Sequence, residues 1–215
     1  MLMHPFKKTC YIFLTLFLTA AISFLLAETL IYAFFRKPLA LFPRYVTQAH
    51  YGDFKIRGNI PRAVYLHKSY DGQWQFRING QGFRADREYS KEKPAGVTRI
   101  LLLGDSFTIG YEVSFEQTFG AVLEKMLKEK GYNAEVINTG VSGYSNAEEL
   151  VFFENEGIRY QPDIVILGFF INDLGDNVRS DLYRFKNGRL ILNSKTYLPA
   201  IRVSNFLNSL PFYRW

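Results

Sequence analysis

Three short segments of the chain contain residue types that could carry out acyl chemistry. "GDS" at residues 104–106 places a serine hydroxyl directly after an apolar run, "TGVSGYS" at 139–145 is a glycine-rich turn with backbone N–H groups, and "IND" at 171–173 sets an amide beside a carboxylate. A hydroxyl can attack an acyl carbonyl, and N–H groups can stabilise the oxygen that becomes negative during that attack. The segments therefore predict a nucleophile and an oxyanion hole, provided that the fold brings them together.

The residues around these segments predict alternating strands and helices. "RILLLG" at 99–104 is a short apolar run, typical of a strand that is covered on both faces. "AEVIN" at 134–138 predicts a second strand and "DIVILGFF" at 163–170 a third. Apolar residues at helical spacing predict one helix at about 116–129, and a capping box predicts a second at about 145–157. The capping boxes expected to open these two helices are Ser114 with Gln117 and Ser145 with Glu148.

This order of elements predicts a parallel sheet with helices on both faces. Ligands of such sheets bind beyond the carboxyl ends of the strands, which is where "GDS", "TGVSGYS" and "IND" stand. We therefore expect an α/β fold that brings the three segments to one rim.

The same three segments resemble a known enzyme family. "GDSFT", "GVSGYSN" and "FFINDL" are similar, in order and spacing, to the first three sequence blocks of the SGNH or GDSL hydrolase superfamily, and the resemblance covers about residues 99–180. It implies a flavodoxin-like three-layer α/β/α fold with a parallel sheet. It also implies an esterase, lipase, carbohydrate deacetylase or O-acetyltransferase.

By this resemblance Ser106 is the nucleophile. The oxyanion donors are the backbone N–H groups of Ser106 and Gly143 and the side chain of Asn172, while Asp105 and Asp173 support the loops. Gly143 fits the family pattern better than Gly140. Phe170 stands where the third block usually has a glycine, which affects the shape of the loop more than the amide chemistry.

The fourth block of the family, an Asp three residues before a catalytic His, is absent. The histidines His4, His50 and His67 all precede Ser106 and none follows an Asp at that spacing, so we interpret them as ordinary surface or neck residues. Only three core strands are visible, and residues 183–192 predict a hairpin. We therefore expect the sequence to be a C-terminally truncated, incomplete hydrolase domain that is itself inactive for lack of the histidine.

Other readings of the serine motif fit less well. An α/β-hydrolase elbow needs a glycine where Thr108 stands, a phosphate-binding loop needs a lysine that residues 100–124 lack, and 104–110 give no dinucleotide fingerprint. No cluster has metal-ligand spacing, so neither a metal nor another cofactor is expected. The net charge of +6 comes from 26 basic and 20 acidic residues without a long basic run, which disfavours nucleic-acid binding.

The N-terminal region predicts a membrane anchor. Residues 11–35 are apolar apart from Glu28, are flanked by basic residues and lack a convincing cleavage site, so they are long enough to cross a bilayer as an uncleaved signal anchor. The single cysteine, Cys10, excludes an intrachain disulfide. Basic residues on both sides leave the orientation unsettled by charge alone.

We divide the chain into a cytoplasmic N-terminus (1–10), the anchor (11–35), a neck with short strands (36–98) and the hydrolase-like domain (99–215). The neck is interpreted as a connector, with Arg77, Asn79 and Arg84 as alternative cleft residues.

The leading hypothesis is a single-pass inner-membrane ester hydrolase whose domain lies on the periplasmic side and acts on acyl esters or acetylated carbohydrate. The alternatives are O-acyl transfer to a cell-surface glycan and a non-catalytic carbohydrate-binding module on the same fold. The substrate, the acyl length and the oligomeric state do not follow from the sequence.

Overall fold

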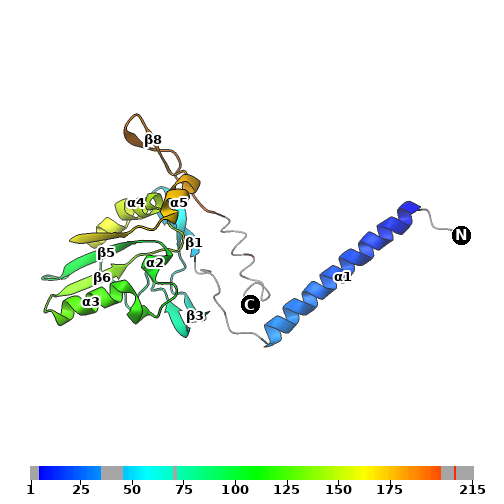
Figure 1. The fold of residues 1–215 in the computed structure, drawn as a ribbon, viewed down its shortest axis with the longest axis horizontal. Helices are drawn as coiled ribbons and strands as arrows, with labels where there is room; N and C mark the ends of the chain where they lie inside the picture. The colour runs from blue at the N-terminus through cyan, green and yellow to red at the C-terminus, as the bar shows by residue number, and fades with distance from the viewer. Residues whose placement is uncertain (1–4, 35–45, 70–71, 200–205, 207–215) are drawn as a thin grey trace.

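A long N-terminal helix precedes the folded domain in the computed structural model, which describes residues 5–34, 46–69, 72–199 and 206 (Figure 1). Helix α1 (Pro5–Phe34) contains one stretch, Lys7–Phe34, that is long and apolar enough to cross a membrane, with a mean hydropathy of 2.3. The hydroxyls of Thr15, Thr19 and Thr29 each donate to the carbonyl four residues earlier, which satisfies them within the helix. The length and apolar character expected of residues 11–34 are present, and Phe35 lies outside the described residues.

The centre of the domain is a three-stranded parallel sheet. Strand β5 (Thr98–Gly104) pairs on one side with β6 (Ala134–Asn138) and on the other with β7 (Ile164–Gly168), which gives the order β6-β5-β7. Residues 99–104 are buried, as expected for a strand that is covered on both faces. The parallel α/β fold predicted from the sequence is confirmed.

Successive residues of β5 face two different helical layers. Ile100 and Leu102 pack with Leu123 and Leu127 of α3 (Phe119–Glu129). On the other face, Leu101 and Leu103 belong to a larger cluster, listed below, that includes residues of α4 (Asn146–Asn155). Figure 1 accordingly shows α3 on one side of the sheet and α4 on the other. The alternation of strand side chains thus produces the three layers.

The helix starts follow the capping signals with one correction. The backbone N–H of Ser145 donates to Glu148 Oε2 at 3.1 Å, and α4 begins at the next residue. The N–H of Ser114 likewise donates to Gln117 Oε1 at 3.4 Å, but this box opens only a 3₁₀ turn, η1 (Phe115–Gln117). Helix α3 begins later than expected because Thr118, whose Oγ1 accepts from the N–H of Ala121, is its N-cap.

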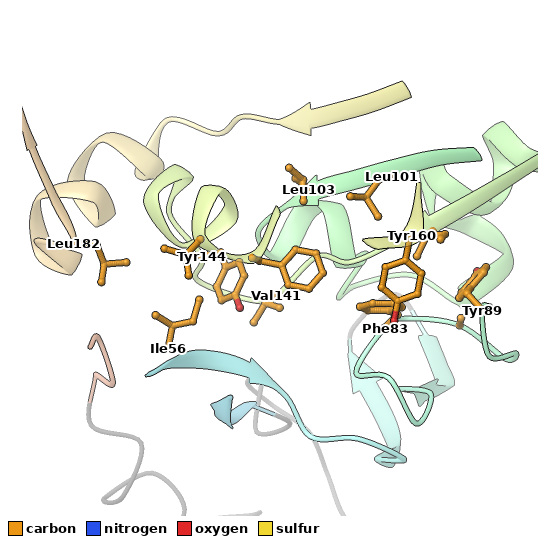
Figure 2. Packing of buried hydrophobic residues seen from close by; sticks show 13 residues of the cluster. Ile56, Phe83, Tyr89, Leu101, Leu103, Val141, Tyr144, Tyr160 and Leu182 are labelled. Atoms are coloured by element: carbon orange, nitrogen blue, oxygen red, sulfur yellow. The ribbon is translucent and has the colours of Figure 1, made fainter. Parts of the chain in front are cut away.

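The segment interpreted as a neck forms two hairpins: the first packs on the sheet through Ile56, and the second belongs to a separate buried cluster that contains Phe76 and Ile109. The hairpins are β1 (Val46–Tyr51) with β2 (Phe54–Asn59), and β3 (Val64–Ser69) with β4 (Gly72–Arg77). The main buried cluster takes Ile56, Phe83, Ala85 and Tyr89 from this segment, and Figure 2 shows it between β5 and β2. Its other members are Leu101, Leu103, Ile137, Val141, Tyr144, Val151, Phe152, Tyr160 and Leu182.

Beyond β7 the chain continues into α5 (Asn172–Ser180) and the predicted hairpin. The hairpin consists of β8 (Tyr183–Lys186) and β9 (Arg189–Leu192). Asn187 and Gly188 at its turn both have positive φ, at 51° and 75°, as a two-residue hairpin turn requires. The remaining short elements are α2 (Ser106–Ile109) and the 3₁₀ turn η2 (Gly157–Tyr160).

Removing a core side chain from the central strand should destabilise the domain. Leu101 is 0% exposed, so Leu101→Ala is expected to lower the free energy of unfolding by about 2–5 kcal/mol through lost burial and a residual cavity. The measurement is thermal unfolding of the detergent-solubilised chain, followed by tryptophan fluorescence. Leu190→Ala, at a position that is 57% exposed, is the control and should change stability by less than about 0.5 kcal/mol. Equal effects of the two variants would contradict this packing.

Candidate active site

The serine stands on the first turn after the central strand. Asp105 is buried and caps α2, accepting from the N–H of Phe107 at 2.9 Å, and Ser106 is the half-buried first residue of that helix. Gly110 ends the helix with a left-handed conformation (φ +69°). A strand that ends in a one-turn helix therefore holds the hydroxyl at the carboxyl edge of the sheet.

Helix α2 packs closely against the ends of strands β5 and β7. Gly104 and Gly168 are partners across β5 and β7, and the side chain of Thr108 lies over both of them. A Cβ at Gly104 would be 1.9 Å from Thr108 Oγ1, and a Cβ at Gly168 would be 2.3 Å from the same atom. On the other side, a Cβ at Gly140 would be 2.5 Å from the backbone nitrogen of Ile109. The approach of α2 therefore depends on three glycines.

The glycine-rich turn after β6 is held by an arginine from the first hairpin. Gly143 has φ +78°, and its carbonyl accepts from the guanidinium of Arg57. Arg57 also forms an ion pair with buried Glu148, at 3.1 Å between Nη2 and Oε2. Gly140, the other candidate donor, already gives its N–H to Asn138 Oδ1 at 3.1 Å. Within the described part of the chain no acceptor takes the N–H of Gly143, which leaves that group free for a ligand.

The third predicted segment reaches the first through its amide. Asn172 is exposed at the start of α5, and its Nδ2 lies 3.4 Å from Asp105 Oδ2 and 3.0 Å from Asp176 Oδ2. Asp173 is buried and accepts from the N–H of Phe170 at 2.9 Å. The structure thus brings Asp105, Asn172 and Asp173 together beside Ser106, as the topology predicts.

A cavity opens beside the serine. It has a volume of about 550 Å³, and its walls include Ser106, Phe107, Tyr111 and Phe119. The ring of Phe107 lies against that of Phe170, with centroids 4.2 Å apart. At the position where the family pattern has a glycine, Phe170 therefore packs against Phe107, which lines the cavity.

The two described histidines have partners other than the serine. His67 is buried, its Nε2 lies 3.2 Å from Glu112 Oε2, and its ring stacks on Trp74 with centroids 4.9 Å apart. His50 is hydrogen-bonded to Gln48 at 2.7 Å. Neither is hydrogen-bonded to Ser106 in the described ranges, and His4 lies outside them.

Burial shapes the electrostatics of the site. Desolvation raises the pKa of Asp105, although the N–H of Phe107 and the amide of Asn172 oppose the shift. Desolvation also raises the pKa of Glu149 to about 7. Arg57, Asn146 and Glu149 belong to this polar layer and were not predicted; the only sequence signal for the last two is their place in the first turn of a capped helix. The described residues contain no group of three His, Cys, Asp or Glu arranged as a metal site.

Comparisons with known proteins agree with the motif pattern. The sequence model of the GDSL-like lipase/acylhydrolase family matches residues 102–212. An arylesterase from Vibrio mimicus is 31% identical over 75 residues, which cover 35% of this chain and 38% of the arylesterase. The crystal structure of AlinE4, an SGNH-hydrolase family esterase, is 34% identical with a TM-score of 0.33, covering 38% of this chain and 44% of that one. A mutant of the same esterase is 33% identical with a TM-score of 0.33, covering 41% of this chain and 46% of its own. The matches thus span less than half the length of these relatives.

A pair of substitutions tests the close packing of α2 against the sheet. Gly168→Ala should lower the free energy of unfolding by about 1–3 kcal/mol, because its Cβ collides with Thr108 Oγ1. Thr108→Ala removes that oxygen and leaves the Thr108 Cβ at 3.7 Å from the added methyl, an ordinary contact. The double variant should therefore lose less stability than the sum of the two single variants, as measured by thermal unfolding. Strict additivity would show that this contact does not set the position of α2.

Proposed function

The chain belongs to the GDSL-like lipase/acylhydrolase family, and on that premise we propose that it is a serine-dependent ester hydrolase. The observation that carries the proposal is the convergence of Ser106, the Gly143 turn and Asn172 at the carboxyl edge of the sheet. Two of these segments are tied directly by the 3.4 Å contact between Asn172 Nδ2 and Asp105 Oδ2. Substrates are acyl esters, including acetylated carbohydrate.

In the proposed mechanism Ser106 Oγ attacks the acyl carbonyl as its proton passes to a base. The carbonyl oxygen becomes negative and accepts hydrogen bonds from the N–H groups of Ser106 and Gly143 and from the amide of Asn172. Asn172 would exchange its bond to Asp176 for this oxygen and keep its contact with Asp105. The alcohol then leaves with a proton, and water hydrolyses the acyl-serine.

We assign the base to a histidine, and neither histidine that the structure describes is hydrogen-bonded to Ser106. His50 and His67 are engaged by Gln48 and Glu112, so each would have to break its present contact to serve Ser106. A serine hydroxyl is a weak nucleophile until a base accepts its proton. The described residues by themselves therefore supply the nucleophile and the oxyanion donors, with little expected turnover.

Acyl transfer to a cell-surface glycan is the second candidate. The observation that favours it is the aromatic lining of the cavity beside Ser106, where Phe107, Tyr111 and Phe119 offer apolar rings to a bound ligand. Transfer would use the same acyl-serine, with a sugar hydroxyl in place of water. Product analysis with and without a glycan acceptor separates the two reactions.

We also place the domain on the periplasmic side of the inner membrane, anchored by α1. The support is the apolar stretch Lys7–Phe34, whose length exceeds that of the apolar region of a cleaved signal peptide. An anchor of this kind would keep the catalytic rim near the membrane surface.

Removing the proposed oxyanion donor should reduce turnover with little effect on folding. Asn172→Ala in the full-length protein is expected to lower turnover of an activated acetyl ester about 100- to 1000-fold, because one preorganised donor to the developing charge is lost. Ser106→Ala should abolish both turnover and labelling by a fluorophosphonate probe. Asn133→Ala removes an exposed amide at the opposite end of the sheet and serves as the matched control. Unchanged turnover in Asn172→Ala would remove this residue from the site.

Protease treatment of intact spheroplasts tests the orientation. The domain from residue 46 onward should be digested without lysis, because α1 leaves it outside the cytoplasmic membrane. A cytoplasmic marker protein must stay intact in the same sample. A domain that is digested only after lysis would reverse the orientation.

A further inference from the structure

Four buried carboxylates lie behind the catalytic rim. Asp105, Glu148, Glu149 and Asp173 are each at most 1% exposed. Glu148 has a cation partner, Arg57 of β2. In the described ranges the other three have no ion pair, so hydrogen-bond donors alone must stabilise whatever charge they carry.

Those donors are unevenly distributed. Asp105 accepts from the N–H of Phe107 and from Asn172, and Asp173 accepts from the N–H of Phe170 and from Asn146. Among the described residues, Glu149 accepts only from Asn146, at 3.0 Å from Nδ2 to Oε2. The same nitrogen lies 3.1 Å from Asp173 Oδ2.

One amide therefore bridges two buried carboxyl groups. The second oxygens of these groups, Glu149 Oε1 and Asp173 Oδ1, are also buried and have no hydrogen-bond partner in the part of the chain that the structure describes. A buried carboxylate that lacks a cation and full hydrogen bonding is strongly disfavoured, and the usual response is to bind a proton. Glu149 has the fewest donors of the three, so it is the group that should be neutral.

We propose that Glu149 is a positioning residue of the active site, a neutral acid that anchors the Asn146 amide so that Asn146 can hold Asp173 and the Phe170–Asn172 turn beside Ser106. The role of that turn rests on the proposed function, whereas the protonation of Glu149 does not. Loss of the proton to solvent would place a second negative charge on the shared amide, opposite Asp173. The turn that presents Asn172 would then lose part of its support.

The charged surroundings agree with this assignment. Desolvation is the main cause that raises the pKa of Glu149 to about 7, and the neighbouring charges of Asp173 on α5, Asp105 at the start of α2 and Glu148 on the same helix add to it. The hydrogen bond from Asn146 opposes the shift. Strands β1 and β5 and the turn η2 also pack on α4. Their charged or titratable groups include His50, Arg99 and Arg159, which pair with Gln48, Glu135 and Glu156 respectively and not with Glu149.

The first experiment compares the melting temperature of the wild-type chain and Glu149→Gln from pH 5 to 8.5. A glutamate titrates near 4.5 when unfolded and here near 7 when folded, so its contribution to stability is complete below the lower value and is lost as the pH rises through the higher one. Glutamine keeps the shape and cannot ionise. The melting temperature of Glu149→Gln minus that of wild type should therefore increase up to about pH 7 and then stay constant.

Glu154→Gln is the matched control, since it removes an exposed carboxylate from the same helix. Its melting temperature should follow that of wild type across the range. An infrared band of a protonated carboxyl group, present in wild type at pH 6 and missing in Glu149→Gln, should accompany the shift. A difference between Glu149→Gln and wild type that does not change with pH would overturn the neutral acid.

Hydrogen exchange tests the positioning role without requiring activity. At pH 6, Glu149→Ala should accelerate exchange of the backbone N–H groups at residues 170–173, and Glu149→Gln should restore slow exchange. Unchanged exchange in Glu149→Ala would overturn the positioning role. If that variant fails to fold, exchange is measured in the wild-type chain instead. Corrected for the intrinsic pH dependence, wild-type exchange at residues 170–173 should accelerate above pH 7, and no acceleration would overturn the role. Ester turnover that Ser106→Ala does not change would count against the proposed function and leave these readouts valid.

Discussion

The close approach of helix α2 to the sheet is the constraint on which the rest of the site depends. Three glycines allow that approach, each in or just before one of the polar segments: Gly104 ends β5, Gly140 lies in the turn after β6, and Gly168 ends β7, three residues before the third segment. Thr108 and the backbone of Ile109 occupy the space that a Cβ at these positions would fill. The segments therefore converge on Ser106 because each of them packs against the helix that begins with it. The same short stretches of sequence therefore contain both the proposed site residues and the glycines that the packing requires.

Buried polar contacts then fix the orientation of the turns that surround Ser106. Arg57 connects β2 to both the Gly143 carbonyl and Glu148, so the first hairpin holds the turn that carries the proposed N–H donor. Asn146 connects the start of α4 to Asp173 and hence to the turn before α5. Removing one partner from such a buried network leaves an unsatisfied group, which costs more free energy than an exposed pair would. Residues 46–98 are consequently part of the support of the site.

Elements whose formation depends on neighbouring residues could be predicted from the sequence. The strand at 134–138, the box that opens α4 and the Asn187–Gly188 hairpin were predicted from neighbouring residues, and the parallel order followed from their alternation with helices. Arg57 and Glu149 escaped prediction because their partners depend on tertiary contacts: Arg57 reaches a residue 86 positions away. The start of α3 was misplaced because Ser114 and Thr118 are both good caps, and the intervening 3₁₀ turn decides between them. The base for Ser106 stays a prediction.

Phe170 shows how the site tolerates a departure from the family pattern. The position usually holds a glycine, yet the N–H of Phe170 still donates to Asp173, which is a backbone interaction that any residue except proline can make. The side chain turns to Phe107, at 4.2 Å between ring centroids, and both rings are substantially exposed beside Ser106. Phe170 therefore leaves the backbone support of the Asn172 turn intact and adds an apolar ring against Phe107, which lines the cavity. Exposed rings of this kind favour contact with apolar or sugar faces, so within the proposed function the departure bears on the choice of ester and leaves the proposed chemistry unaltered.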